Sequence, residues 1–288
     1  MTPRFRMVAG PNGSGKSTLT AWLARAFDVN FYTLLNADVF YDHAREQRRV
    51  ALPFSVDGTA LLAYAVGSTY AEDVKRFFQD GSIVIVDDCV QFRTLESANS
   101  YTVALVTNFL QSECIERKIS FSQETVFSHP SKVEALRQAS EVEYRTYFYF
   151  VATCDPAVNA ERVRNRSAQG GHDVPDEKIM ARYVRSLAQV RAARPFLSRA
   201  FFFDNSGDEM RFLASWSADE GLALTGQELP VWFTHHVNPY FSVDSNSVRV
   251  EMIHRRGSVG ALKGLVKRTG GPVSLAEMDD AIATETSK

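Results

Sequence analysis

The chain of 288 residues has few cysteines and no excess of positive charge. Cys89, Cys114 and Cys154 are far apart and lack metal-ligand spacing, which argues against a disulfide scaffold or a zinc site and fits a reducing compartment. The formal net charge of −2 argues against a generally basic nucleic-acid binder. No apolar run is long enough to cross a bilayer, and Met1 leads directly into a predicted strand, so we expect a cytoplasmic protein without a signal peptide.

A glycine-rich run close to the amino terminus matches a phosphate-binding loop. The sequence AGPNGSGKST, residues 9–18, has the required residue at every fixed position of G-x-x-x-x-G-K-[ST]. A short apolar strand is predicted before it and an amphipathic helix over residues 17–27 after it, which is the context in which this motif binds phosphate. We expect ATP to bind to Gly10, Pro11, Asn12, Gly13, Ser14, Gly15, Lys16, Ser17 and Thr18. Among these, Lys16 is expected to reach the outer phosphates and the Ser17 hydroxyl to hold Mg²⁺.

Strands and helices alternate along the sequence. Strands are predicted at residues 4–9, 30–35, 82–86, 119–122, 146–152 and 200–203, and helices at 61–78, 97–117, 131–142, 156–167 and 175–193. This order predicts an α/β fold of the P-loop NTPase class, with a parallel sheet, helices on both faces and small peripheral β-hairpins, one of them over residues 212–224. We expect one domain over residues 1–241 and a flexible or regulatory tail over residues 242–288.

Polar residues at the carboxyl ends of strands are the candidates for chemistry, because ligands of parallel sheets bind there. They are Asn36 with Asp38, Glu124 with Thr125, Asp155, and Asp204 with Asn205. Asp38 is the best candidate for the base of a phosphoryl transfer. The alternative roles of Asp38 are to coordinate magnesium or to cap a helix. Glu124 can bind substrate hydroxyls or assist the metal.

Phosphoryl transfer also needs cations around the transferring group. Arg162 and Arg166 form an i, i+4 pair on one predicted helix, and Arg182 lies on the next. The segment between the two helices, Gly170–Pro175, has the glycines and proline of a lid hinge. The alternative is that these arginines belong to a solvated helical face.

The run IVIVDD, residues 83–88, allows two interpretations. An apolar strand followed by acids is typical of a Walker B element, which would make Asp87 or Asp88 a metal carboxylate. The residues that follow, Cys89–Phe92, continue the extended pattern and favour a β-hairpin with Asp87 and Asp88 in its turn.

Several blocks resemble, in order, those of the zeta-toxin-like P-loop kinases, and most closely their bacterial branch of predicted ATPases. The blocks are AGPNGSGKST, NAD at 36–38, FSQETVFSHPSK at 121–132, NAERVRNRSAQGGHDVP at 159–175, RYVRSL at 182–187 and FDNS at 203–206. The resemblance implies a kinase that phosphorylates a sugar hydroxyl of UDP-N-acetylglucosamine with ATP and Mg²⁺ and is blocked by a small antitoxin. It implies that Asp38 is the base, that Arg162 neutralises phosphate, and that Glu124 and Thr125 contact substrate. We add Asn36 and His129, which lie in these blocks, as candidate substrate contacts.

The sequence also departs from that family. The second arginine of the toxins falls near His172, so Arg166 or Arg182 must substitute for it. Residues 52–97 are an insertion, and because they include Asp87 and Asp88 they favour the hairpin over the Walker B element. Residues 256–283 resemble the toxin-binding arms of AbrB-type antitoxins, which suggests a tail that inhibits this chain or a partner; a loosely docked tail is the alternative.

The predicted function is therefore an ATP-dependent kinase of a small nucleotide-sugar-type substrate. The alternatives are a nucleotide-gated ATPase or switch, in which water replaces the acceptor, and a nucleic-acid end kinase, which the charge balance disfavours.

Overall fold

The computed structural model describes residues 2–169, 174–242 and 249–250. Most of the predicted lid hinge and nearly all of the predicted tail, including the antitoxin-like segment, lie outside these residues. The chain divides into two units: the first comprises Met1–Tyr32 and Phe121–Lys288, and the second comprises Thr33–Ser120. In the described ranges no helix has the length and apolar character needed to cross a membrane.

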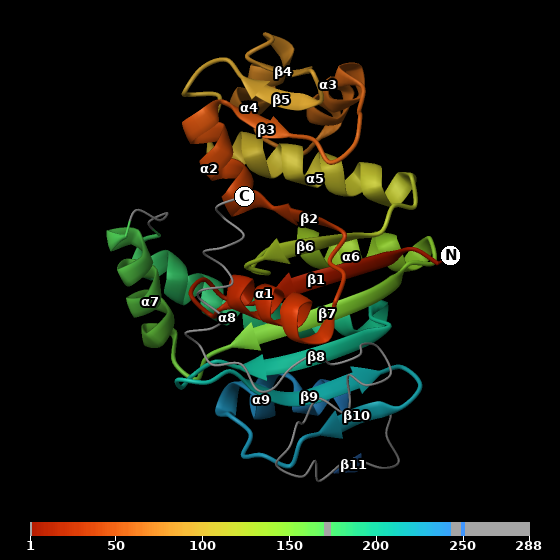
Figure 1. The fold of residues 1–288 in the computed structure, drawn as a ribbon, viewed down its shortest axis with the longest axis vertical. Coiled ribbons are helices and arrows are strands. Elements are labelled where there is room, and N and C mark those ends of the chain that lie inside the picture. The colour runs from red at the N-terminus through yellow and green to blue at the C-terminus, as the bar shows by residue number, and fades with distance from the viewer. Residues whose placement is uncertain (1, 170–173, 243–248, 251–288) are drawn as a thin grey trace. The chain divides into compact units, whose positions relative to one another are not determined.

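The first unit is built on a mostly parallel sheet (Figure 1). Its strands are β1 (Arg4–Ala9), β6 (Phe121–Thr125), β7 (Arg145–Ala152), β8 (Arg199–Asp204), β9 (Arg211–Ser217), β10 (Gly221–Leu224) and β11 (Arg249–Val250). They lie in the order β11-β10-β9-β8-β7-β1-β6. β1 runs parallel to β6 and β7, and β7 runs parallel to β8, which confirms the predicted parallel sheet. The predicted hairpin is β9 with β10, and it extends this sheet by antiparallel pairing of β9 with β8.

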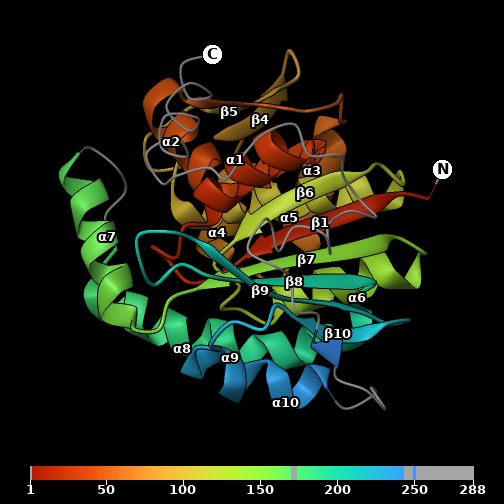
Figure 2. The same ribbon diagram turned by 60° about the horizontal axis from the view of Figure 1, so that its bottom comes forward.

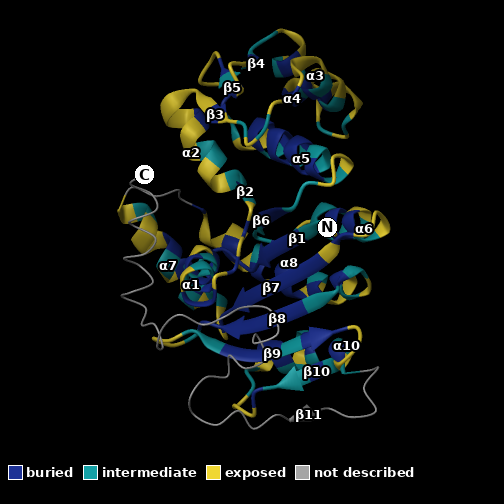
Figure 3. Cartoon of the chain, turned by 45° about the vertical axis from the view of Figure 1, so that its right-hand side comes forward, coloured by how far each residue is buried: buried dark blue, intermediate teal, exposed yellow. Residues whose placement is uncertain are grey.

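Helices cover both faces of this sheet, as the sequence predicts. They are α1 (Lys16–Phe27), α6 (Ser131–Glu141), α7 (Pro156–Ala168), α8 (Asp176–Ala193), α9 (Val231–His236) and α10 (Asn238–Phe241). In Figure 2, α1 lies above the strands, and α8, α9 and α10 lie below them. Such two-sided cover explains why the central strands are almost wholly buried (Figure 3).

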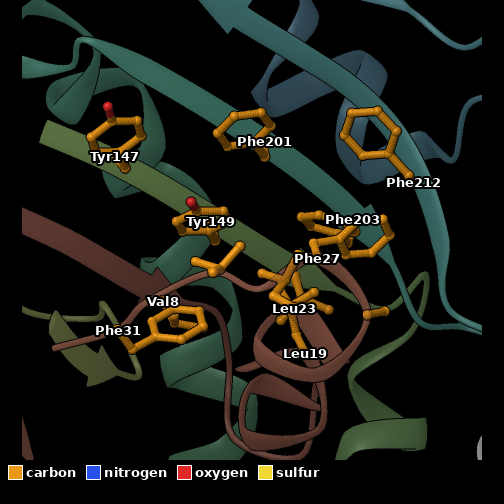
Figure 4. Packing of buried hydrophobic residues seen from close by; sticks show 13 residues of the cluster. Val8, Leu19, Leu23, Phe27, Phe31, Tyr147, Tyr149, Phe201, Phe203 and Phe212 are labelled. Atoms are coloured by element: carbon orange, nitrogen blue, oxygen red, sulfur yellow. The ribbon is translucent and has the colours of Figure 1, made fainter. Parts of the chain in front are cut away.

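Alternate residues of the central strands pack against α1. Val8 of β1, Tyr149 of β7 and Phe203 of β8 share a cluster with Leu23 and Phe27 of α1 (Figure 4). The spacing of the helical residues places them on the stripe of α1 that faces the sheet. This packing fixes the start of α1 against the end of β1, and the glycine-rich run lies between those two points.

The intervening strand residues face the other side. Phe150 of β7 contacts Trp232 at a ring distance of 5.9 Å, and Phe202 of β8 contacts Phe233 and Phe241 at 5.6 and 5.1 Å. Aromatic side chains on both faces explain why phenylalanine is so common in the sequence.

The second unit contains its own small antiparallel sheet. Its elements are β2 (Thr33–Asn36), α2 (Ala37–Gln47), β3 (Arg49–Ala51), α3 (Gly58–Gly67), α4 (Glu72–Gln79), β4 (Ile83–Val86), β5 (Cys89–Phe92) and α5 (Ser100–Glu116), and β3, β5 and β4 pair in that order. The single helix predicted over residues 61–78 is wrong. The chain forms two helices there because Ser68 is extended and its hydroxyl bonds the Ala65 carbonyl at 2.7 Å, which ends α3.

The predicted β-hairpin at Asp87 and Asp88 is confirmed. Val86 pairs with Cys89 across the turn, and both aspartates have positive φ, 50° and 53°, as a two-residue type I′ turn requires. Because β4 belongs to the small antiparallel sheet, it is not a strand of the sheet that contains β1, and the Walker B interpretation is wrong.

Asp204, at the end of β8, joins several elements of the first unit. It is 1% exposed, and its carboxylate accepts hydrogen bonds from the Ser206 hydroxyl at 2.8 Å, Trp232 Nε1 at 2.9 Å and Arg211 at 3.1 Å. The structure therefore gives Asp204 a structural role, although its position at a strand end made it a candidate for chemistry.

Asp204→Ala should lower the free energy of unfolding by about 2–3 kcal/mol, because it removes a charged acceptor and leaves buried Trp232 Nε1 without one. Arg211→Ala is the matched control, and since Arg211 is 41% exposed its cost should be about 1 kcal/mol or less. Urea unfolding measures both. Equal costs for the two variants would contradict this role of Asp204.

Candidate nucleotide-binding site

The glycine-rich run forms a tight loop between β1 and α1. Gly13 has φ +73° and Gly15 has φ +92°, a region that residues with a side chain rarely occupy. Neighbouring groups also approach closely. A Cβ on Gly13 would lie 2.4 Å from the Asn159 carbonyl oxygen, and one on Gly15 would lie 2.4 Å from Asn205 Nδ2. At Gly13 a Cβ would collide with backbone, and at Gly15 it would displace a buried amide side chain, while the positive φ favours glycine at both positions.

The start of α1 gathers the groups that a triphosphate needs. Lys16 is 8% exposed, and its ammonium donates to the Pro11 carbonyl across the loop at 3.0 Å. The Ser17 hydroxyl is exposed and donates to Glu124 Oε1 at 2.8 Å. Helix N–H groups and the helix dipole add positive potential at this point. The start of α1 and the end of β6 therefore bring together a cation, a hydroxyl and a carboxylate.

Two of the three predicted arginines are held next to the loop. Arg162 on α7 donates to the carbonyl of Asn205 at 2.9 Å, and Arg182 on α8 donates to Asn12 Oδ1 at 3.3 Å. Arg166 is exposed, one turn further along α7 from Arg162, and has no ion pair among the described residues. The contacts bring Arg162 and Arg182 together around the loop and leave Arg166 outside that group.

Thr125 and His129 follow β6 and make local contacts. The Thr125 hydroxyl accepts the N–H of Phe127 at 3.2 Å, and the Thr125 carbonyl accepts the N–H of Gly10 at 3.3 Å. His129 Nδ1 accepts the N–H of Ser131 at 3.2 Å, next to the start of α6. These contacts shape the segment after β6, and a role of either residue in binding substrate stays a prediction.

Asn36 and Asp38 lie in the second unit, where β2 passes into α2. Asn36 Oδ1 accepts the N–H of Asp38 at 3.0 Å and of Val39 at 3.4 Å, so it caps the helix. Asp38 is exposed in the first turn of α2, directly after a strand. It does not make the cap itself, because Asn36 does. Asp155, another strand-end candidate, caps α7 through the N–H of Ala157 at 2.8 Å.

Sequence reasoning missed Asn159 as a residue of this site. It is fully buried in the first turn of α7, its Nδ2 donates to the Asn12 carbonyl at 2.6 Å, and its Oδ1 accepts from the Thr153 hydroxyl. The one available signal was its i, i+4 spacing with Val163, which places an amide side chain on the buried face of α7. Tyr183 supports the same region: its hydroxyl donates to the Thr153 carbonyl at 2.6 Å, and burial raises its pKa to about 12.

Solved structures share this fold. Comparison with protein-family models and with curated protein sequences finds no match. The AvrRxo1-ORF1:-ORF2 complex with ATP matches with a TM-score of 0.51 at 12% identity, covering 98% of this chain and 76% of that chain. The same complex with sulphate ions matches with a TM-score of 0.50 at 12% identity and the same coverage. The PezAT toxin-antitoxin system of Streptococcus pneumoniae matches with a TM-score of 0.46 at 11% identity, covering 85% of this chain and 80% of that chain.

The chain has the predicted α/β fold of the P-loop NTPase class. The strand, loop and helix context predicted for the glycine-rich run is present, and the fold expected from the zeta-toxin-like resemblance is confirmed.

Gly13→Ala should weaken ATP binding by about tenfold or more, because the new Cβ would collide with the Asn159 backbone and move the loop. Gly67→Ala is the control: nothing lies within 4 Å of a Cβ there, and Gly67 is the last residue of helix α3. Calorimetric titration with ATP measures both affinities. Undiminished ATP binding by Gly13→Ala would show that the loop is not the phosphate site.

Proposed function

We propose that this chain is an ATP-dependent phosphotransferase that phosphorylates a hydroxyl of a small nucleotide-sugar-type substrate. The observation that carries the proposal is the group around the loop: Lys16, the pair of Ser17 with Glu124, and the arginines Arg162 and Arg182. This group combines a phosphate cradle, oxygen ligands and cations, which phosphoryl transfer needs together. The similarity in fold to AvrRxo1-ORF1:-ORF2, one of whose structures contains ATP, supports the nucleotide.

The residues beside the loop fit Mg²⁺. Magnesium prefers hard oxygen ligands and accompanies the outer phosphates of a nucleotide. Ser17 Oγ and Glu124 Oε1 are such oxygens, 2.8 Å apart in the structure. The Ser17 hydroxyl would hold Mg²⁺, and Glu124 would orient that hydroxyl. The bound ion would supply positive charge to the outer phosphates.

The proposed chemistry needs a base at the acceptor. The acceptor hydroxyl oxygen forms a bond to the γ-phosphorus, the bond from that phosphorus to the bridging oxygen breaks, ADP leaves, and Asp38 takes the hydroxyl proton. The position of Asp38 supports this role, because its carboxylate is exposed and follows directly after a strand. Lys16, Arg162 and Arg182 stabilise the charge on the transferring group.

UDP-N-acetylglucosamine is the acceptor to test first, because the zeta-toxin-like blocks imply it. Asn36, Thr125 and His129 remain the proposed substrate contacts, and the cytoplasm is the proposed location. A small antitoxin is the proposed protein partner, since AvrRxo1-ORF1 is solved together with AvrRxo1-ORF2. A tail that inhibits the kinase is the other proposed regulator.

Asp38→Asn should lower the rate of transfer by about 10²–10⁴-fold and leave the ATP dissociation constant nearly unchanged, because it removes only the base. Lys16→Ala should weaken both ATP binding and transfer. Glu46→Gln changes an exposed acid later on the same helix as Asp38 and should have no effect. The measurement is ³¹P NMR of protein, ATP, Mg²⁺ and UDP-N-acetylglucosamine, in which a phosphomonoester on the sugar should appear together with ADP.

Other products would contradict the proposal in distinguishable ways. ADP and free phosphate alone, with or without the sugar, would indicate an ATPase or switch. A product formed only from an oligonucleotide with a free 5′-hydroxyl would indicate a nucleic-acid end kinase. Loss of ATP binding in Asp38→Asn would make Asp38 a metal ligand or structural residue.

Glu124→Gln should raise the Mg²⁺ concentration needed for half-maximal turnover by about tenfold or more, because it removes the negative charge next to Ser17. Glu141→Gln is the control, since that carboxylate makes a surface ion pair with Arg137 on α6. A magnesium titration of the turnover rate gives the comparison. An unchanged magnesium requirement combined with a raised KM for the acceptor would make Glu124 a substrate contact instead.

A further inference from the structure

Two asparagines outside the glycine-rich motif contact its backbone carbonyls. Asn159 Nδ2 on α7 donates to the Asn12 carbonyl at 2.6 Å, and Asn205 Nδ2 after β8 donates to the Ser14 carbonyl at 3.0 Å. Both side chains are buried, Asn159 fully and Asn205 to within 3% exposure. The two contacts are separated in sequence by one residue of the loop.

Each of these bonds fixes the orientation of one peptide plane. In a trans peptide the C=O of one residue and the N–H of the next point in opposite directions. Holding the Asn12 carbonyl toward Asn159 therefore turns the Gly13 N–H to the opposite side. Holding the Ser14 carbonyl toward Asn205 does the same for the Gly15 N–H.

These two N–H groups have no acceptor among the described residues, whereas Gly10 N bonds Thr125 O and Ser14 N bonds Pro11 O. Gly13 and Gly15 are half-buried, so their N–H groups can be reached by a ligand. A series of such N–H groups beside a helix start is how glycine loops bind phosphate. The carbonyls, which would repel an anion, are the groups that the asparagines hold away.

Both asparagines pack closely against the loop glycines. A Cβ on Gly13 would collide with the backbone of Asn159, and a Cβ on Gly15 would collide with the amide of Asn205. Asn159 is itself oriented by the Thr153 hydroxyl, which donates to its Oδ1 and leaves Nδ2 for the loop. Arg162 in turn donates to the Asn205 carbonyl at 2.9 Å and fixes that residue from α7.

We propose that Asn159 and Asn205 are positioning residues that orient the Gly13 and Gly15 N–H groups toward the nucleotide phosphates. This inference rests on the proposed function for the identity of the ligand but concerns binding rather than transfer. Neither asparagine contacts the phosphates in this account. Each acts through the peptide plane that it holds.

The test measures equilibrium binding of ATP and of inorganic pyrophosphate to the full chain, without any acceptor. Asn159→Ala and Asn205→Ala should each weaken both ligands by about three- to tenfold, the effect of one hydrogen bond. The factor should be the same for the two ligands because the lost orientation concerns phosphate alone. Asn159→Asp and Asn205→Asp keep the shape but remove the donor, and they should weaken binding at least as much.

Asn99→Ala is the matched control. Asn99 caps α5 in the second unit through the N–H groups of Tyr101 and Thr102. Its loss should lower the melting temperature without changing either affinity. A cooperative thermal unfolding transition shows that a variant is folded. Where an alanine variant does not fold, the affinity is measured for the aspartate variant at the same position.

Wild-type affinities in the folded Asn159 and Asn205 variants would overturn the proposal, as would an equal loss of affinity in Asn99→Ala. A loss for ATP but not for pyrophosphate would also overturn it, since the effect would then lie in the nucleoside. A wild-type chain that binds both ligands but transfers no phosphate would refute the proposed function and leave this inference standing.

Discussion

The close approach of two neighbouring segments to the glycine-rich loop is the constraint on which the rest of the site depends. The start of α7 packs so near Gly13 that no Cβ fits there, and the Asn205 side chain after β8 occupies the position that a Cβ on Gly15 would take. Asparagine side chains from both segments donate to the loop carbonyls. Arg162 on α7 contacts the segment after β8, and Arg182 on α8 contacts Asn12 of the loop. In the proposed complex, phosphate recognition therefore depends on three segments of the chain, and the glycine-rich motif is only one of them.

The core of the first unit explains why these segments meet. Alternate residues of β1, β7 and β8 pack against α1 on one face and against α9 and α10 on the other (Figure 4). Because the strands are parallel, β1, β7 and β8 all end at the same edge of the sheet. The loop, the start of α7 and the segment after Asp204 follow those ends, and Asp204 holds the last of them through Ser206 and Trp232.

Much of the first unit could be predicted from sequence, because its signals are local. Apolar strand runs, helical periodicity and the glycine motif identified β1, α1, β7 and the hairpin β9–β10. The break between α3 and α4 could not be predicted from periodicity, because the helix ends where the backbone of Ser68 becomes extended, between two segments that both bury apolar residues. Asn159 was missed because its contact with Asn12 joins residues 147 positions apart. Asp204 was a candidate for chemistry because its hydrogen bond with Trp232 also joins distant residues, which a local sequence pattern does not reveal.

The most direct measurement of the central claim is the amide NMR spectrum of the chain during titration with ADP and Mg²⁺. The Gly13 and Gly15 amide protons should shift strongly downfield as they acquire charged acceptors, while the Gly10 amide, already bonded to Thr125, should change little. Saturable binding of ADP that leaves the Gly13 and Gly15 amides unshifted would contradict the claim that this loop holds the nucleotide phosphates.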